Sequence, residues 1–178
     1  MNIYLLKRRK KSGSLKSFDF KWDLKKCGEN IAISEDGKSV NLEEKGYVFR
    51  TVLGDTPMYK GNYYWEILPS LSTKFPLKIG VSAKIPDFNK AFSDFKEGFA
   101  YYGSGSLRNG SAILGESFGN PFVNEGVIGV FLNMDKGILS FSLNNRYLGV
   151  AYKSKFLTLG PIFPAVALLN CAGFKTFT

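Results

Sequence analysis

The chain has 178 residues, of which 44% are hydrophobic and 15% aromatic, so one compact domain with a substantial core is expected rather than a disordered chain. Its formal net charge is +9, and it contains no histidine. Because imidazole is the commonest general base and metal ligand, this excludes Ser-His-Asp and Cys-His hydrolases and His-ligated zinc or iron centres built from this chain alone, while carboxylate or lysine chemistry stays open.

The first part of the chain carries most of the positive charge. Residues 1–18 contain no acidic residue, and their cations include the run Lys7, Arg8, Arg9, Lys10 and Lys11. Consecutive cations repel one another, so we expect residues 1–17 to form a disordered or extended basic arm. Such an arm could direct nuclear import, attract an acidic partner or only add solubility. Nucleic acid is not the expected partner, because the remaining basic residues are scattered.

The segment from residue 18 onward reads as short strands separated by turn residues, with no long helical periodicity. A hairpin is expected where residues 31–34 and 39–42 flank a Glu-Asp-Gly-Lys turn. A dense aromatic strand is expected over residues 63–68, and further strands over 77–81 and 98–102. Residues 85–97 are expected to form an irregular loop, and residues 103–110 a flexible surface loop.

The second half contains the clearest hairpins. Residues 127–132 are apolar without alternation, which is typical of a central strand. Residues 138–143 alternate apolar residues with serines and lead through Asn144 and Asn145 into a returning strand over residues 147–152. Regularly spaced strands of this kind predict an all-β sandwich. Trp65 and Phe141, within these strands, are expected in its core.

Two cysteines, Cys27 and Cys171, are too few for a disulfide scaffold, and we expect both to be buried thiols. The N-terminal apolar stretch Ile3-Tyr4-Leu5-Leu6 is too short for a secretion signal, and no segment is apolar enough to span a membrane. We therefore expect a protein of the cytoplasm, with the nucleus or the cytoskeleton as further locations.

The order of these elements carries a resemblance to a known family. The segments that carry it are Phe20-Lys21-Trp22-Asp23, residues 33–40, Val52-Leu53-Gly54-Asp55, Lys60 to Ile67, Ile79-Gly80-Val81, Gly126 to Met134, Leu139 to Asn145, Leu148 to Ala151 and Phe163-Pro164-Ala165-Val166. Over residues 18–178 the chain resembles the SPRY family, including the PRY segment that often precedes its core. The resemblance implies a bent sandwich of two antiparallel sheets, of the concanavalin-type jelly roll, with the termini close together.

The resemblance also implies a function. SPRY relatives bind peptides or protein surfaces. The resemblance implies no catalysis, so we expect no catalytic residue, no metal ligand and no cofactor. Peptide-binding relatives use loops at one end of the sandwich. Carried onto this sequence, those loops supply the candidate partner-binding residues Glu44, Lys45, Tyr47, Phe88, Phe92, Tyr101, Leu169 and Asn170. One branch of the family has a Trp where this chain has Asn170, so the peptide motif of that branch is not expected here.

Two alternatives stay open. The domain could be a structural component of a larger assembly, held by its basic arm on an acidic polymer such as a microtubule or nucleic acid. It could also be a lectin, since exposed aromatic residues stack on sugars. A salt-sensitive loss of binding after removal of residues 1–17 would favour the first alternative over loop-mediated recognition.

Overall fold

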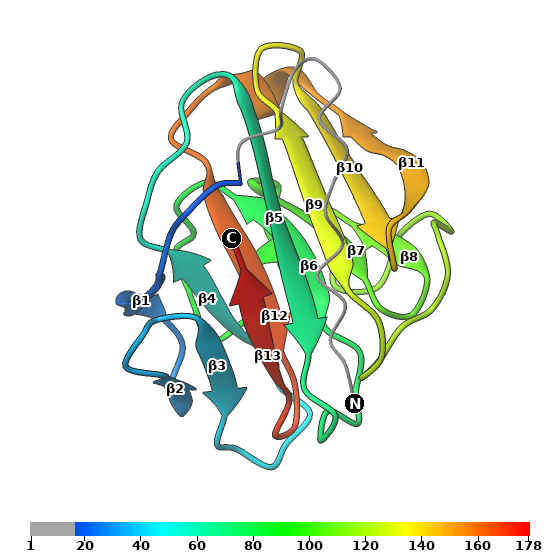
Figure 1. Ribbon diagram of the computed structural model, residues 1–178. Coiled ribbons are helices and arrows are strands. Elements are labelled where there is room, and N and C mark those ends of the chain that lie inside the picture. The colour runs from blue at the N-terminus through cyan, green and yellow to red at the C-terminus, as the bar shows by residue number, and fades with distance from the viewer. Residues whose placement is uncertain (1–16) are drawn as a thin grey trace, which may run out of the picture.

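The computed structural model describes residues 17–178, and these form a sandwich of two antiparallel sheets (Figure 1). The predicted arm, with Lys7, Arg8, Arg9, Lys10 and Lys11, lies outside the described residues except for Ser17. In spatial order, the six-stranded sheet contains β1 (Trp22–Cys27), β4 (Arg50–Gly54), β12 (Phe163–Leu168), β6 (Lys78–Ser82), β7 (Gly98–Tyr102) and β8 (Ser106–Arg108). The seven-stranded sheet contains β11 (Arg146–Lys153), β10 (Ile138–Leu143), β9 (Ile128–Asn133), β5 (Asn62–Pro69), β13 (Gly173–Phe177), β3 (Ser39–Leu42) and β2 (Ile31–Ile33).

Both predicted hairpins are confirmed. Strands β2 and β3 pair with Ile33 opposite Val40, and β10 pairs β11 with Leu143 opposite Arg146. Asn144 and Asn145 join the second pair with φ of 52° and 64°. Two successive left-handed residues match the twist of a two-residue hairpin, and asparagine tolerates this conformation better than most side chains.

The main core lies between the two sheets. The aromatic residues at its centre include Trp65 on β5, Phe141 on β10 and Phe174 on β13, and all three are essentially inaccessible to solvent. The rings of Trp22 and Phe174 meet edge to face at 5.1 Å, and the Trp22 indole N–H donates to the Thr176 hydroxyl at 2.8 Å. The predicted core positions of Trp65 and Phe141 are therefore confirmed.

A second, smaller core covers the outer face of the six-stranded sheet. That face carries small residues, among them Gly98, Ala100 and Ala165, and the segment between β6 and β7 folds onto it with Phe92 inserted. A Cβ atom at Gly98 would lie 2.1 Å from the Phe92 carbonyl oxygen, so only glycine permits this approach. A short 3₁₀ turn, Phe92–Asp94, interrupts the segment that the sequence predicts to be irregular.

The structure corrects two local predictions. The expected flexible loop over residues 103–110 contains strand β8, because Leu107 is buried in the main core and lies opposite Tyr101 of β7. The expectation that both thiols are buried is wrong: Cys27 is half-buried and Cys171 is exposed. Cys171 lies in the turn between β12 and β13 with φ of 56°, where backbone conformation rather than packing fixes its position.

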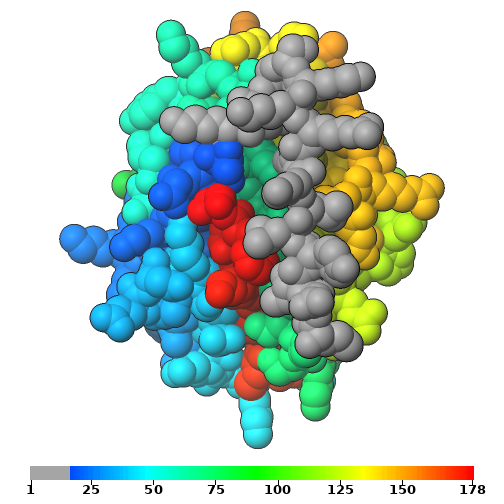
Figure 2. Space-filling model, in the orientation of Figure 1, coloured from blue at the N-terminus to red at the C-terminus, as the bar shows by residue number. Residues whose placement is uncertain are grey.

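The beginning of the described chain lies beside the C-terminal residues. The Thr178 hydroxyl donates to the Asp19 carboxylate at 3.1 Å, and Phe18 donates its backbone N–H to the Tyr64 carbonyl oxygen. Figure 2 shows the corresponding dark blue and red surfaces in contact. No helix within residues 17–178 is both long enough and apolar enough to cross a membrane.

Candidate functional site

Backbone and ionic contacts connect the loops that the sequence selects for partner binding. The β3–β4 loop and the β12–β13 loop lie together at the lower end of the sandwich in Figure 1. The backbone N–H of Cys171 donates to the Glu44 carbonyl oxygen at 2.9 Å, which joins these two loops. Part of the β6–β7 segment is tied to them through Arg50. We call residues 43–49, 86–90 and 169–171 the three-loop surface.

Arg50 at the start of β4 is the connecting residue. One terminal nitrogen of its guanidinium lies 3.0 Å from the Glu44 carboxylate, and the other donates to the Asn89 carbonyl oxygen at 3.3 Å. The Arg50 side chain is almost fully covered, so the pair is screened less than a surface salt bridge. The Glu44 carboxylate is thereby committed to holding the loops, and it is not free for a partner.

The 86–90 part of the surface is fixed from two further sides. Thr51 of β4 donates its backbone N–H to the Phe88 carbonyl oxygen at 2.8 Å, and the backbone N–H of Glu29 donates to the Asn89 side-chain oxygen at 2.9 Å. Gly28 packs so closely that a Cβ atom there would lie 2.5 Å from the Phe88 carbonyl oxygen. This segment is therefore presented on a fixed framework, as a preorganised binding loop requires.

The exposed apolar part of the three-loop surface is formed by the β3–β4 loop. Tyr47 is 77% exposed and Val48 is also exposed, beside the exposed Lys45. The Tyr47 ring meets the Phe75 ring edge to face with centroids 5.6 Å apart, so Tyr47 has a defined position despite its exposure. Figure 2 shows the cyan loop projecting from the lower edge of the molecule.

Phe75 is a site residue that the sequence analysis missed. It belongs to the β5–β6 loop, which also presents the exposed Leu71 and is anchored by the buried Thr73, whose hydroxyl donates to the Gly173 carbonyl oxygen at 2.9 Å. The sequence feature that could have identified this loop is the presence of the apolar residues Leu71 and Phe75 among the Ser, Thr and Pro residues that follow the aromatic strand.

Several predicted site residues lie inside the molecule instead of on this surface. Phe92 and Tyr101 are fully buried, so neither can touch a partner, and Leu169 is also buried. Phe92 fills the second core, because the small residues beneath it leave room for a ring. Tyr101 points between the sheets, where its ring packs on Phe141 at 5.4 Å and its hydroxyl donates to the Asn120 carbonyl oxygen. Burial raises the pKa of Tyr101 to about 12.

The other predicted residues keep some exposure. Lys45 and Tyr47 are exposed, whereas Glu44, Phe88 and Asn170 are half-buried. Asn170 has a φ of 48°, the left-handed conformation that lets the chain reverse between β12 and β13. Of these five, Lys45, Tyr47, Phe88 and Asn170 are the part of the prediction that the structure leaves available for contact, since the Glu44 carboxylate is held by Arg50.

A buried lysine supports the surface from beneath. Lys78 of β6 is only 2% exposed, and its Nζ lies 4.4 Å from the centre of the Phe49 ring and 3.3 Å from the Asp94 carboxylate. Burial lowers the pKa of Lys78, while the charge and hydrogen bond of Asp94 oppose that shift. The lysine joins the β3–β4 loop, β6 and the 3₁₀ turn, so it positions the surface from within.

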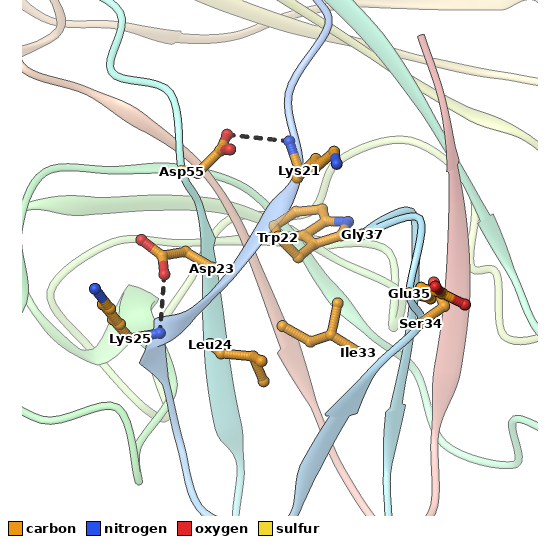
Figure 3. Close-up of a pocket in the computed structure, with 10 residues that line it drawn as sticks. All are labelled: Lys21, Trp22, Asp23, Leu24, Lys25, Ile33, Ser34, Glu35, Gly37 and Asp55. Carbon is orange, nitrogen blue, oxygen red and sulfur yellow. Dashed lines mark hydrogen bonds between the residues drawn. The ribbon is translucent and has the colours of Figure 1, made fainter.

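A separate crevice of about 380 Å³ lies beside β1 and the β2–β3 turn (Figure 3). Trp22, Leu24 and Ile33 supply its apolar wall. Two of its carboxylates bind backbone N–H groups, Asp55 that of Lys21 and Asp23 that of Lys25. Within residues 17–178, no group of three or more Cys, Asp or Glu side chains could hold a metal ion.

Comparison with known proteins identifies a family. A family model described as the SPRY domain matches residues 62–177. Among curated proteins, a probable ATP-dependent RNA helicase, ddx1, of Dictyostelium discoideum is 29% identical over 110 residues, which is 62% of this chain and 14% of the helicase. The chain thus corresponds to a small part of that relative.

Solved structures share the fold at low sequence identity. The SPRY domain of human HERC1 superposes with a TM-score of 0.69 at 19% identity, covering 87% of this chain and 96% of that one. The PSpry domain of TRIM65 superposes with a TM-score of 0.68 at 16% identity, covering 91% and 93%. Stonustoxin gives a TM-score of 0.70 at 21% identity over 90% of this chain and 29% of the toxin chain. These likenesses confirm the two-sheet sandwich inferred from the sequence.

Proposed function

The chain belongs to the SPRY domain family, and we propose that it is a non-catalytic interaction module that binds a peptide or a partner's surface with the three-loop surface. SPRY domains are generally protein-interaction modules, which supports the general class of function. The observation that carries the specific proposal is the network Asn89–Arg50–Glu44, which holds separate loops in one arrangement around the exposed Tyr47.

The composition of the surface fits recognition of a protein. Tyrosine supplies a large contact area with few rotatable bonds, and such residues dominate the binding energy of many interfaces. Tyr47 and Val48 form the apolar centre, and Glu43 and Lys45 place charges around it. An apolar centre with a charged rim is the usual anatomy of a non-obligate interface.

The proposal is tested by affinity capture with matched variants. The full chain, Tyr47→Ala and Tyr59→Ala are used as baits at high salt, and bound proteins are quantified by mass spectrometry. Tyr59 is the control because it is 59% exposed and lies in the β4–β5 connection, at the other end of β4 from the three-loop surface. Partners that Tyr59→Ala retains and Tyr47→Ala loses support the proposal. Equal recovery with all three baits contradicts it.

The charge run favours a second contribution. Lys7, Arg8, Arg9, Lys10 and Lys11 are consecutive cations in the sequence, and such a run attracts an acidic surface in a salt-dependent way. We propose that this arm strengthens binding to an acidic partner without selecting it. If the arm alone anchored the chain on an acidic polymer, removing residues 1–17 would abolish binding, and high salt would abolish it equally.

A further inference from the structure

The end of the sandwich opposite the three-loop surface carries charge of mainly one sign. Three segments meet there, at the top of Figure 1: residues 60–61, residues 134–137 and residues 153–160. Their charged side chains are four lysines and one acid, all of them exposed: Lys60, Lys136, Lys153, Lys155 and Asp135. We call these three segments the lysine end.

Hydrogen bonds hold the three segments of the lysine end side by side. On one side of the 134–137 turn, the Gly61 backbone N–H donates to the Asp135 carboxylate at 3.0 Å. On its other side, the Ser154 backbone N–H donates to the Gly137 carbonyl oxygen at 2.8 Å. The lysines of the two outer segments are therefore grouped around Lys136, although the sequence places the segments far apart.

The domain does not neutralise these lysines by pairing. Within residues 17–178, none of the four lies within ion-pair distance of a carboxylate. Other lysines of the domain are already paired, as Lys38 is with Asp19. The carboxylate of Asp135, the one acid of the lysine end, accepts the backbone N–H of Gly61. The four ammonium groups therefore keep their charge available for a partner.

The described chain begins at this same end of the sandwich. Ser17 pairs in parallel with Tyr64, close to the start of β5, and the Phe18 ring meets the Tyr63 ring edge to face at 4.9 Å. The Tyr63 hydroxyl in turn donates to the Lys60 carbonyl oxygen at 2.9 Å. The first described residues are thus connected to a segment of the lysine end through one side chain.

The basic run of the sequence precedes this point by a short length of chain. Lys11 lies six residues before Ser17, and Lys7 lies ten residues before it. At roughly 3.3 Å for each extended residue, these lengths of chain span about 20 and 33 Å. An elongated partner that contacts the lysine end is therefore within reach of the basic run.

We propose that the lysine end and the basic run form one docking surface for an acidic segment of a protein partner. This inference rests on the role proposed above for the arm and extends it to the folded domain. One acidic chain that contacts both elements gains affinity, because the second contact is made at high effective concentration. A protein is the favoured partner because SPRY domains generally bind proteins, and because lysine lacks the planar fork with which arginine recognises phosphate.

The test is fluorescence anisotropy of a fluorescein-labelled oligoglutamate peptide titrated with the full chain at low and high salt. Binding should be measurable at low salt and should weaken strongly at high salt. Lys136→Glu combined with Lys155→Glu should weaken the low-salt binding about fivefold or more, because two attractions become two repulsions. The control, Lys25→Glu combined with Lys74→Glu, changes the net charge equally at exposed lysines outside the lysine end. It should weaken binding by less than about twofold. Equal weakening by the two variants would overturn the proposal, since net charge alone would then govern binding.

A third variant separates the lysine end from the arm acting alone. Glutamine replaces all five cations of the basic run in the full chain, and this variant should still bind oligoglutamate at low salt, with lower affinity. If it loses all binding and the lysine-end variant binds like the natural chain, the arm acts alone and the proposal is overturned. Failure of the natural chain to bind the peptide, or tighter binding of a single-stranded RNA of equal charge, overturns it as well. The three-loop surface is tested separately with Tyr47→Ala, so these outcomes do not bear on it.

Discussion

Arg50 and Glu44 form an ion pair of 3.0 Å that joins the start of β4 to the loop before it, while Arg50 also reaches the Asn89 carbonyl oxygen. The sequence separation between Arg50 and Asn89 is 39 residues, so a single side chain holds two loops that the sequence places far apart. This contact explains how the three-loop surface keeps one shape in the absence of a partner.

Replacing Arg50 should damage stability and binding together. Arg50→Ala removes hydrogen bonds to a carboxylate and to a carbonyl oxygen, and it leaves Glu44 without its cation. We expect a loss of about 1–3 kcal/mol in the free energy of unfolding, measured by urea denaturation. A double-mutant cycle with Glu44→Gln should show coupling between the two residues. Additive effects would contradict the role given to this pair.

Phe92 and Tyr47 are both predicted from the sequence as partner-binding residues, but their replacement by alanine should affect stability differently. Phe92→Ala leaves a cavity in the second core and should cost about 3–5 kcal/mol of stability. Tyr47→Ala alters an exposed ring and should change stability by about 0.5 kcal/mol or less, while it weakens partner binding. Urea denaturation of both variants checks the difference, and equal losses of stability would refute the burial assigned to Phe92.

The difference between Phe92 and Tyr47 shows which features of the structure could be predicted from the sequence. The hairpins were predictable because their turns are local: the Glu-Asp-Gly-Lys segment and the Asn144–Asn145 pair specify them without help from distant residues. The strands on either side of the candidate loops were also predicted, through the resemblance, whereas partner binding by those loops stays a prediction. Phe92 is buried because Gly98 and other small residues of the six-stranded sheet leave room for it. These residues come together only when the sheet has formed, so the sequence alone does not reveal the burial.

The missed site residues have a similar cause. The contact between Tyr47 and Phe75 joins loops from different hairpins, and Lys78 is buried between Phe49 and Asp94, which belong to two other segments. Composition favours an exposed lysine, and only the tertiary arrangement provides rings and a carboxylate to cover one. Long-range packing, which has no local signature, decided each of these positions.

The titration of Tyr101 gives a prediction at alkaline pH. Burial raises its pKa from 10.0 to about 12 in the folded chain. The neutral phenol is therefore favoured by folding, and this contribution is complete below pH 10 and is lost as pH rises through 12. Between these values the unfolding free energy should fall by up to about 1.4 kcal/mol per pH unit from this group.

The control for that prediction is Tyr101→Phe, which keeps the ring and removes the ionising group. Comparing the two proteins at each pH cancels the contributions of other groups, including Lys78, whose lowered pKa gives the opposite slope. The stability difference between natural chain and variant should shrink from pH 10 to pH 12. A difference that is constant with pH would contradict the burial of the Tyr101 hydroxyl.

Removing the basic arm should separate attraction from recognition. A chain lacking residues 1–17 should bind the same partner with lower affinity at low salt and with nearly the same affinity at high salt, because screening weakens contacts between exposed charges. Isothermal titration at two ionic strengths measures both values. Complete loss of binding at both would make the arm, and not the loops, the recognition element.

The most direct test of loop-mediated recognition is hydrogen–deuterium exchange of the full chain with and without its captured partner. The account predicts slower exchange of backbone amides in residues 43–49, 86–90 and 169–171 when the partner is bound, with no change in the crevice beside β1. Protection confined to residues 1–17, with the three loops unchanged, would contradict it.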